Sequence, residues 1–523
     1  MKFNLTILIY FLIFGISFGQ NQNISMGNVF DGEPFLAIKP NNSQQLVIAW
    51  MGYVGTPKIA IKTSSSFDGG QTWSPIIGIA HVAQEFGSAD PSLSFDANGN
   101  VFLSYIDYDK DTKTGAIYIR KSTDNGLHWG NAVHVIDATD DPDHYPIDRP
   151  WMCIDQSGSA YDGNIYITSI SPKNFGNLNP PFHPYITRSI NNGNSFNTWQ
   201  FLDNTNWLSG DNIQQPMPTN CVSTDGILYA VYPSYVTSQN IYPQYILASS
   251  SDGGSTFTYH SVLIGTHNVS SNLAKKGYLI LSDPSHAQHL SFFYLAEDYG
   301  DIDVFMCESF DAGLSWSQSV RINDDPIGND RMQDLLWADF DDDGDLAVAW
   351  RDRRNAPSNT YETSYEIWGS IKEKNTSNFS RNFRISDRQI DYNPILANSG
   401  NDFMSLKMKN DSLYAAWGDT RNGKMNIWFQ SLDNTNNALT LPKNNKDIGF
   451  KIFPNPSNTS IRITGKSIRE INIFSIDGQQ IIHQNYYKPT DNVLLNIDKL
   501  ANTSYFIFIK GKESSTTQKF IKK

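Results

Sequence analysis

Short apolar runs separated by polar turns recur along most of this chain, and their alternation predicts β-strands throughout. Each unit opens with a short strand, makes a polar turn and continues with a second strand that ends in an aromatic or small residue. Seven openings can be aligned, and they begin at Glu33, Asp90, Arg149, Gln215, Lys276, Asp334 and Asp402. Seven second strands follow them, at 46–50, 101–105, 165–169, 228–232, 290–294, 346–350 and 413–417. Two independent features therefore agree on seven repeats.

A second signal returns at intervals of roughly sixty residues: Ser, any residue, Asp, any residue, Gly, two further residues and an aromatic. Four copies cover 66–73, 122–129, 250–257 and 309–316, and a weaker fifth with Asn in place of Asp covers 189–196. Asp close to Gly between apolar runs indicates a tight β-turn, because the turn needs positive φ and a side-chain acceptor. One turn per unit at this period predicts a propeller or a solenoid, in which each unit buries its apolar face against its neighbours.

This phrase resembles the Asp-box, or BNR repeat, of the sialidase-like β-propellers, and the resemblance spans about residues 31–440. In that family the Asp-box is a structural turn away from the active site. The resemblance therefore implies structural roles for Asp68, Trp73, Asp124, Trp129, Asp252, Phe257, Asp311 and Trp316. Known sialidases have six blades. We expect an all-β Asp-box propeller of seven blades, with six as the alternative if a terminal strand pair only closes the ring.

The N-terminus predicts export. Lys2 is followed by an apolar run from Leu5 to Phe18, and the small residues Ser17 and Gly19 stand where a signal peptidase reads. This run is too short and wrongly flanked for a membrane span, so residues 1–19 are predicted to be a secretory signal peptide. No later apolar stretch approaches the roughly eighteen residues that a membrane-spanning helix needs, so we expect no transmembrane segment.

Net charge and cysteine content exclude several classes of partner and of structural site. The formal charge of −13, from 40 basic and 53 acidic residues, argues against nucleic acid and anionic membranes. Cys153, Cys221 and Cys307 lie in apolar strand-like runs and cannot form a disulfide framework. Buried thiols are expected, with a bridge between Cys153 and Cys221 in consecutive repeats as the alternative. Their spacing does not suggest zinc.

The C-terminal part of the chain is predicted to be a second, small domain. Residues 434–448 are rich in Asn, Lys and Thr and lack a strand pattern, which predicts a linker after a propeller of residues 20–433. From residue 449 onward, alternating apolar runs predict a small Ig-like antiparallel β-sandwich.

This tail, from Pro454-Asn455-Pro456 to the closing Lys519–Lys523, also resembles the C-terminal sorting domain of type IX secretion cargo in Bacteroidota. The resemblance implies the type IX secretion machinery as a partner. It also implies export through the outer membrane and a secreted or cell-surface protein. A carbohydrate-binding or adhesive sandwich is the alternative.

The residues that head the innermost strands of a propeller meet around one central opening, so the seven openings are predicted to converge there. The resulting ring is polar and mixed in sign, which leaves a sugar site, a cation site and a solvated channel mouth as open interpretations. Carboxylates on different blades can supply the acid and the base that glycoside cleavage needs. Glu33, Asp90 and Asp334 are therefore the candidate catalytic residues. The alternative is that these acidic residues cap turns ahead of strands.

Sialidases hold the substrate carboxylate with three arginines, because paired guanidinium donors match a carboxylate. The family's first arginine precedes Ile-Pro in the first blade, whereas this chain has Gly32-Glu33-Pro34 there, which argues against sialic acid. The candidate substrate-binding residues are Arg149, Gln215, Arg331 and Tyr392. Arg149 and Arg331, with Arg351, are candidates for a different anion site, and Tyr392 is the counterpart implied by the family's tyrosine nucleophile.

No cofactor is expected, and calcium is the alternative. Asp339, Asp341, Asp343 and Gly344 match the start of an EF-hand loop, but the twelfth position is Trp350 and the flanks read as strands. A hairpin turn is the preferred interpretation.

Two functions are consistent with these features. The first is a secreted sialidase-superfamily propeller that acts on extracellular glycans, as a glycoside hydrolase not specific for sialic acid. The second is a non-catalytic surface propeller that binds a glycan or a protein. The fold alone does not decide between them, because one fold hosts many activities.

Overall fold

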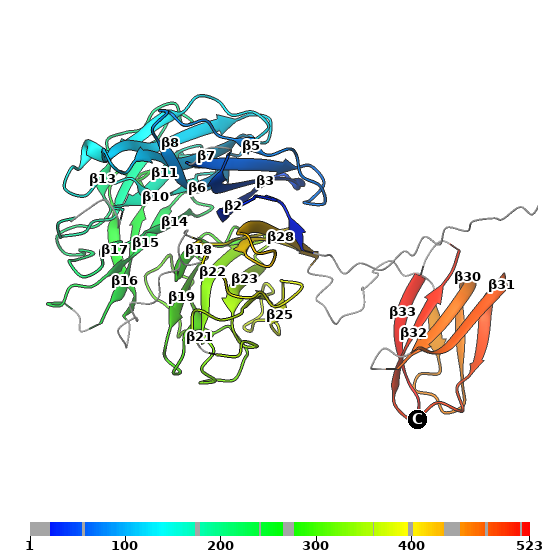
Figure 1. Cartoon of the computed structure of the whole chain (residues 1–523). Helices are drawn as coiled ribbons and strands as arrows, with labels where there is room; N and C mark the ends of the chain where they lie inside the picture. Colours follow the sequence, from blue (N-terminus) through cyan, green and yellow to red (C-terminus); the bar gives the residue numbers. More distant parts are fainter. Residues whose placement is uncertain are drawn as a thin grey trace, which may run out of the picture. The chain divides into compact units, whose positions relative to one another are not determined.

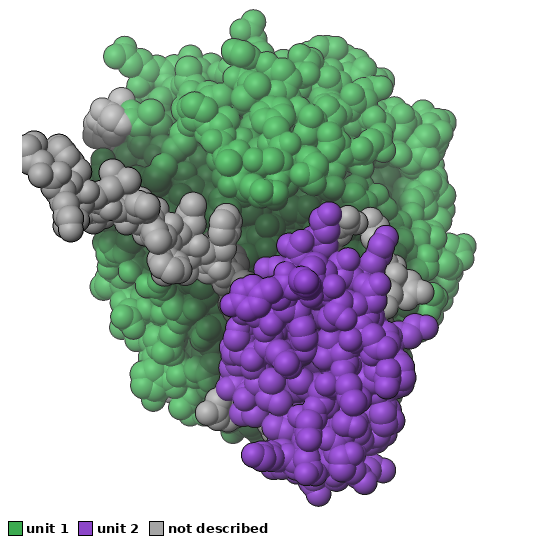
Figure 2. All heavy atoms as spheres, turned by 90° about the vertical axis from the view of Figure 1, so that its right-hand side faces the viewer, with its two compact units in different colours: residues 1–432 green, residues 433–523 purple. Residues whose placement is uncertain are grey.

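The computed structural model describes residues 21–54, 58–172, 178–239, 242–264, 277–358, 360–395, 401–433, 450–475, 480–512 and 515–523. The chain divides into two compact units, residues 1–432 and 433–523 (Figure 1, Figure 2). The predicted signal peptide, the predicted linker and Lys276 lie outside the described residues. Within the described residues, no helix is long and apolar enough to cross a membrane.

The first unit is a β-propeller, whose described residues form seven antiparallel sheets of four strands each (Figure 1). The innermost strands contact one another around the ring, and they are β2 (Asp31–Lys39), β6 (Gly87–Phe95), β10 (Asp148–Ile154), β14 (Thr219–Val222), β18 (Tyr278–Ser282), β22 (Gln333–Phe340) and β26 (Ser405–Lys409). The second strands are β3 (Asn42–Tyr53), β7 (Val101–Asp109), β11 (Ile165–Ile170), β15 (Leu228–Ser234), β19 (Leu290–Ala296), β23 (Leu346–Asp352) and β27 (Ser412–Asp419).

The third and fourth strands of each blade lie progressively further out. The third strands are β4 (Ile59–Ser66), β8 (Thr114–Ser122), β12 (Tyr185–Ser189), β16 (Gln244–Ser250), β20 (Asp303–Ser309), β24 (Glu366–Lys372) and β28 (Asn426–Asp433). The outer strands are β5 (Ile77–Gly78), β9 (Val133–Asp137), β13 (Gln200–Phe201), β17 (Thr258–Ile264), β21 (Val320–Arg321), β25 (Phe383–Arg384) and β1 (Gln22–Asn23).

The ring closes by pairing the two ends of the propeller. β1 pairs antiparallel with β28, with Gln22 opposite Phe429 and Asn23 opposite Trp428, so the first strand of the chain is the outer strand of the last blade. The prediction of a seven-bladed propeller is confirmed, and each predicted second strand lies within the second strand of one blade.

The Asp-box turns join the third strand to the outer strand in the first five blades. In the first copy, Ser66 Oγ accepts a hydrogen bond from Gly70 N at 2.8 Å and donates one to Asp68 Oδ1 at 2.9 Å. Asp68 Oδ1 also accepts from Thr72 N at 2.8 Å. Equivalent bonds recur in the other copies, with Asn191 replacing Asp in the third. Local side-chain acceptors thus hold each turn closed.

The glycine of the Asp-box also lets neighbouring blades pack closely against each other. Gly70 has φ +86° and lies against the ring of Phe429 in the last blade, and a Cβ there would come within 2.5 Å of that ring. Gly313 has φ +88° and lies equally close to Leu247 of the preceding blade. Only glycine combines this backbone conformation with such a close approach.

An aromatic plug fills the centre of the ring, formed by Phe35, Trp151, Trp337 and Phe403 on four innermost segments. Ring centroids lie 5.4 Å apart for Phe35 and Trp337, 5.3 Å for Trp151 and Trp337, and 5.1 Å for Trp151 and Phe403. All four side chains are buried. The channel is therefore packed midway, which separates its two mouths.

The three cysteines are thiols in the structure: Cys307 is buried, and Cys153 and Cys221 are half-buried. Burial raises the pKa of Cys221 and of Cys307 to about 12 in each case. These groups therefore stay protonated at neutral pH and are weak nucleophiles.

His289 ties the fifth blade to the sixth. Its Nδ1 lies 2.8 Å from Asp283 Oδ2 and its Nε2 lies 3.0 Å from Glu308 Oε1, while Lys372 Nζ of the next blade contacts Glu308 at 2.6 Å. Burial by itself would lower the pKa of His289, but the hydrogen bonds to Asp283 and Glu308 outweigh it, so the pKa is raised.

Because the folded pKa of His289 exceeds the unfolded value, its protonation stabilises the propeller most fully below about pH 6.5. That contribution disappears as the pH rises through the folded pKa. We expect the melting temperature of the native chain to exceed that of His289→Gln at pH about 6, and the difference to shrink at pH about 9. All 12 tryptophans lie in the first unit, so tryptophan fluorescence reports this unit alone. A pH-independent difference would contradict the assignment.

The second unit is an all-β domain with a core of its own. Its strands are β29 (Lys451–Phe453), β30 (Ser460–Phe474), β31 (Gln480–Asn496), β32 (Ser504–Lys510) and β33 (Ser515–Ile521). They join into one hydrogen-bonded antiparallel sheet in which the first half of β30 pairs with β29 and β31, and the second half pairs with β31 and β32. Alternate residues such as Ile461, Ile463, Ile507 and Ile509 are buried, as the period of two in the sequence predicts.

Candidate functional site

One backbone irregularity repeats at the start of three innermost strands. Glu33, Asp90 and Arg149 each precede a proline and have φ of 57°, 52° and 52°. At each of them the register between the innermost and second strands shifts, which marks a β-bulge. A bulge redirects a side chain, and positive φ in a non-glycine residue costs energy. Such strain is concentrated at functional sites, so these three positions mark a candidate functional site.

The bulges bring together a set that we call the carboxyl cluster, which consists of Glu33, Asp90, Asp148, Arg149, Gln215 and Asp402. The carboxyl of Asp90 is within hydrogen-bonding reach of both Glu33 and Asp148. Two carboxylates cannot donate to each other, so each contact requires a proton. Burial, followed by the nearby Asp90 charge, raises the pKa of Glu33 and of Asp148 well above the usual range.

The buried environment of Glu33 points to the same protonation. Glu33 is only 2% exposed, and its Oε2 is buried without a hydrogen-bond partner among the described residues. A proton on Glu33, donated to Asp90, removes this orphaned acceptor. Glu33, Asp90 and Asp148 thus form a chain of three neighbouring carboxyls with Asp90 at its centre.

An arginine, a glutamine and a fourth acid complete the carboxyl cluster. Arg149 Nη2 lies 2.6 Å from Asp402 Oδ2, and Gln215 Nε2 donates to Asp148 Oδ2 at 2.8 Å. The backbone NH of Arg149 lies 3.3 Å from Asp90 Oδ2, and that of Asp402 lies 3.3 Å from Glu33 Oε1. The side chains of Arg149 and Asp402 are 16% and 24% exposed, so solvent reaches this mouth of the channel.

A tyrosine borders the carboxyl cluster. The pKa of Tyr108 is raised to about 12 by burial and by the neighbouring carboxyls of Asp90, Asp148 and Glu33. The cluster thus combines four carboxyls, two of them with a raised pKa, and one guanidinium, that of Arg149. The arrangement offers proton donors next to a carboxylate, which is the composition of a general acid–base site.

Asp334, predicted from the sequence to be catalytic, lies in a different environment. The ladder of β22 also shifts at this point, but the residue with positive φ is Leu335, so Asp334 stands one position earlier in the bulge. Its oxygens accept from Arg351 Nε at 2.7 Å, Arg351 Nη2 at 2.5 Å and Arg353 Nη1 at 3.1 Å. All three side chains are buried. Burial would raise the pKa of Asp334, but the two guanidinium groups lower it far below the usual range.

Of the four predicted substrate-binding residues, the structure brings Arg149 and Gln215 into the carboxyl cluster. Arg331 instead donates from its backbone NH to Asp301 Oδ2 at 2.7 Å and from Nη1 to the Asp330 carbonyl at 2.8 Å. The ring of Tyr392 lies 6.1 Å from that of Tyr361, which in turn lies over the guanidinium groups of Arg351 and Arg353. The described hydrogen bonds of Arg331 are therefore to Asp301 and Asp330, whereas Tyr392 packs against Tyr361 and against the central core cluster.

Sequence reasoning missed Asp148 as a site residue and named Asp402 only as the head of a strand. Asp148 could have been found from its place directly before Arg149-Pro150 in the sequence. A β-bulge lets two consecutive residues point toward the same end of the channel. Asp402 heads the last innermost strand, and its pairing with Arg149 joins residues 253 positions apart.

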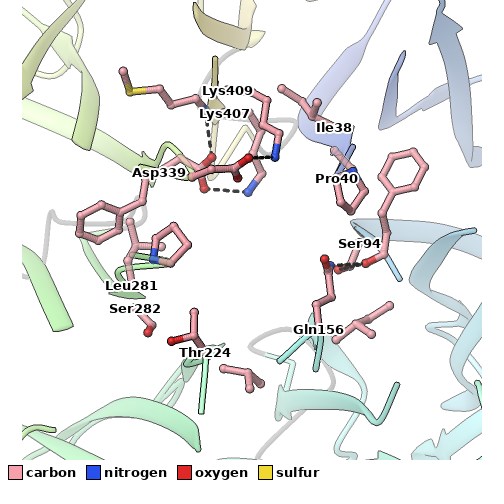
Figure 3. A pocket seen from close by; sticks show the side chains of 18 of the residues that line it. Ile38, Pro40, Ser94, Gln156, Thr224, Leu281, Ser282, Asp339, Lys407 and Lys409 are labelled. Atoms are coloured by element: carbon pink, nitrogen blue, oxygen red, sulfur yellow. Dashed lines mark hydrogen bonds and ion pairs between the residues drawn. The ribbon is translucent and has the colours of Figure 1, made fainter. Parts of the chain in front are cut away.

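The opposite mouth of the channel holds a cavity of about 420 Å³ (Figure 3). Residues near the ends of all seven innermost strands line it, among them Ser94, Gln156, Thr224, Leu281, Asp339 and Lys407. Its charged groups are paired: Lys407 Nζ lies 2.8 Å from Asp339 Oδ1, and Lys409 contacts Asp342. The cavity thus lacks the proton-sharing acids of the carboxyl cluster.

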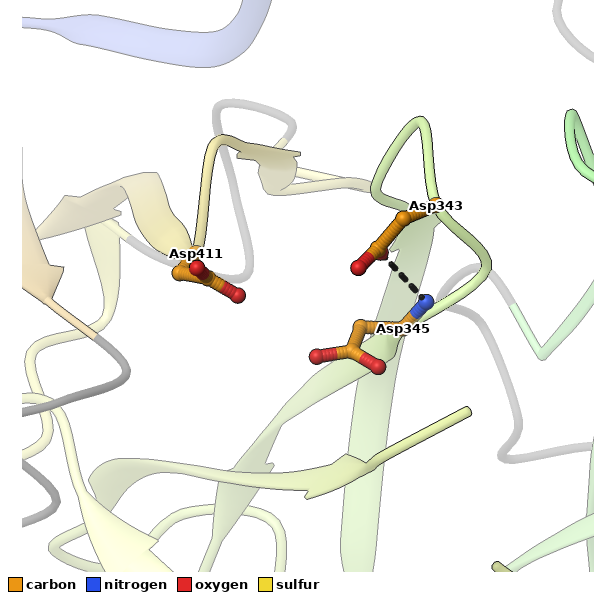
Figure 4. Close-up of side chains that lie close together, drawn as sticks. All are labelled: Asp343, Asp345 and Asp411. Carbon is orange, nitrogen blue, oxygen red and sulfur yellow. Dashed lines mark hydrogen bonds between the residues drawn. The ribbon is translucent and has the colours of Figure 1, made fainter. Parts of the chain in front are cut away.

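The EF-hand-like pattern does not assemble a calcium loop. Asp339 accepts from Lys407 and from Met408 N, and Asp341 accepts from the backbone NH groups at 410 and 411. The carboxylates of Asp343, Asp345 and Asp411 instead lie together, with one oxygen of each within 4.8 Å of the others (Figure 4); Asp343 and Asp411 are exposed and Asp345 is buried. Asp345 also accepts from Lys374 N at 2.6 Å, and residues 341–345 form the turn between β22 and β23 through bonds from Asp341 N to Asp345 O and from Gly344 N to Asp341 O. The residues present fit a hairpin turn better than a calcium site.

Comparison with known families identifies the second unit. Residues 451–523 match the family model described as the secretion system C-terminal sorting domain. The second unit is a sorting domain. The protein is therefore exported by the type IX secretion system to the cell surface or the medium, and the secretion machinery is its partner. This confirms the localisation that the tail predicts.

Solved structures resemble the chain only distantly. An α-L-arabinanase from Penicillium chrysogenum, in complex with arabinobiose, is 13% identical, with 80% of this chain and 98% of that chain covered and a TM-score of 0.44. The NanB sialidase from Streptococcus pneumoniae is 13% identical, with 79% and 70% covered and a TM-score of 0.36. A protein of unknown function from Dyadobacter fermentans is 14% identical, with 67% and 98% covered and a TM-score of 0.41. No curated protein matches the chain. The propeller assignment rests on the seven sheets themselves.

Proposed function

We propose that the propeller is an extracellular glycoside hydrolase whose acid and base are carboxyls of the carboxyl cluster. The observation that carries the proposal is the chain of Glu33, Asp90 and Asp148, in which two acids with raised pKa flank one carboxylate at a solvent-reachable mouth. Glycoside cleavage needs a proton donor for the leaving oxygen and a carboxylate that attacks or activates water.

Asp148 is suited to be the acid. Its raised pKa keeps it protonated to a higher pH than an exposed aspartate, and Gln215 holds the carboxyl in place by donating to its Oδ2. Asp148 is also half-buried, so a glycosidic oxygen at the mouth can approach it, whereas Glu33 is enclosed. The leaving oxygen would take the Asp148 proton as the bond to the anomeric carbon breaks.

Asp90 is suited to be the carboxylate partner once a bound glycan separates it from Asp148, because the two carboxyls must lie at least about 5 Å apart across the scissile bond. Asp90 sits between the two acids and also lies near the backbone NH of Arg149. Glu33, by donating to Asp90, would orient that carboxylate and regulate its basicity, which makes Glu33 a positioning residue. Arg149 and Asp402 complete the rim of the mouth.

The test is to incubate the exported protein with neutral, uronic-acid and sialylated glycans and to identify released sugars by mass spectrometry. We expect release from neutral glycans that disappears in Asp90→Asn. The matched control is Asp342→Asn at the opposite mouth, where the carboxylate is 64% exposed; this variant should release sugars at the native rate. No release from any glycan by the native protein would overturn the proposal and favour a propeller that only binds.

A further inference from the structure

The guanidinium of Arg149 is the cation of the carboxyl cluster, and it already forms an ion pair with Asp402. Its Nη2 lies 2.6 Å from Asp402 Oδ2 and its Nη1 lies 3.4 Å from the sulfur of Met217, and among the neighbouring carboxyls Asp402 does most to raise the pKa of Arg149. A planar guanidinium binds a carboxylate through two parallel N–H donors. Asp402 already neutralises this guanidinium through Nη2, so an incoming carboxylate would compete with it.

Within the described residues of the cluster, the balance of charged groups also opposes an acidic ligand. Four carboxyls, two of them with a raised pKa, surround one guanidinium. Deprotonation of either acid adds a further negative charge. A uronic or sialic acid would therefore enter a site that repels it and that offers no unpaired cation within the cluster, whereas a neutral sugar meets hydrogen-bonding groups without this cost.

We propose that Asp402 is a specificity-determining residue, which neutralises Arg149 and restricts this mouth to uncharged glycans. This inference rests on the proposed function, since it assumes that the mouth receives a glycan. It also predicts a gain of function. Removing the Asp402 charge should leave the Arg149 guanidinium available to bind the carboxylate of an acidic sugar. The residue that excludes acidic sugars is then an acid on the seventh blade, acting through an arginine on the third.

The experiment compares glycans that differ only by a carboxylate at C6, as matched pairs of glucose and glucuronate, galactose and galacturonate, and mannose and mannuronate oligomers on an array. The native full chain should bind neutral members and not the uronates. Asp402→Asn keeps the side-chain shape and should raise affinity for uronates by roughly tenfold to a hundredfold, the effect of one new charge-assisted pair. The double variant Asp402→Asn with Arg149→Gln should lose that gain.

Asp342→Asn is the matched control, because it releases Lys409 from its partner at the opposite mouth. It should leave the preference for neutral glycans unchanged, which separates a local effect from a general change in net charge. Native binding to uronates, or no gain in a folded Asp402→Asn protein, would overturn the role of Asp402 alone. No binding and no cleavage of any glycan by the native chain would instead overturn the proposed function, and the inference with it.

Discussion

Replacing Asp148 with asparagine should lower kcat on the neutral glycan by about two to four orders of magnitude, the usual contribution of a general acid. The asparagine keeps the shape of the side chain and its oxygen can still accept from Gln215, so KM should change little. The loss should be smaller for aryl glycosides with an acidic phenol, because such a leaving group needs little protonation. Steady-state kinetics on both substrate types measure the difference.

The pH profile gives a second readout of the same substitution. The acid must be protonated to act, so the rate of the native protein falls as the pH rises through the pKa of Asp148. Burial and the adjacent Asp90 raise that pKa, so the fall should occur well above the range of an ordinary aspartate. In Asp148→Asn this basic limb should vanish. Equal losses for all leaving groups, or an unchanged basic limb, would assign the proton to another group.

The repeat features of the fold could be predicted because each is encoded locally. Apolar alternation located the second strands, and the Asp-box needs only residues within one turn, such as Ser66, Asp68 and Gly70. The count of seven also held, because the strand that closes the last blade, Gln22–Asn23, comes from outside the repeats and does not alter the number of openings.

The candidate site could be predicted only in part, since its geometry depends on bulges. Glu33, Asp90 and Arg149 share a following proline, which made their equivalence visible. The sixth blade lacks that proline. Asp334 was aligned with Asp90, but the residue with positive φ in the sixth blade is Leu335, so the alignment was one residue off. The sequence also gives no sign that Asp402 is paired with Arg149.

Asp148 and Asp334 occupy the same position in their bulges, directly before the residue with positive φ, yet they have opposite environments. Asp148 has acids as neighbours and an elevated pKa, whereas Asp334 has two guanidinium groups and a depressed one. A group that must lend a proton belongs in the first environment. A carboxylate that remains ionised between two buried cations fits a fixed structural contact, and this difference can be tested by its effect on folding.

Asp334→Ala should destabilise the propeller by about 3–5 kcal/mol, because it leaves the buried guanidinium groups of Arg351 and Arg353 without a counter-charge. Asp342→Ala, which removes an exposed partner of Lys409, should cost about 0–1 kcal/mol. Urea unfolding followed by tryptophan fluorescence measures both, since the tryptophans lie in the first unit. Comparable losses for the two variants would contradict the buried ion-pair assignment.

The pH dependence of the same variants fixes the sign of the effect. The folded pKa of Asp334 is depressed, so its stabilising contribution is fully present above the unfolded value of about 3.9 and is lost as the pH falls through the folded pKa. The gap between native and Asp334→Asn should therefore persist from neutral pH down to about pH 4 and narrow only below it. Folded Asp334→Asn should also keep its glycan turnover. A variant that is fully stable but inactive would return Asp334 to a catalytic role, because the side chain would then matter to the reaction and not to the packing of the sixth blade.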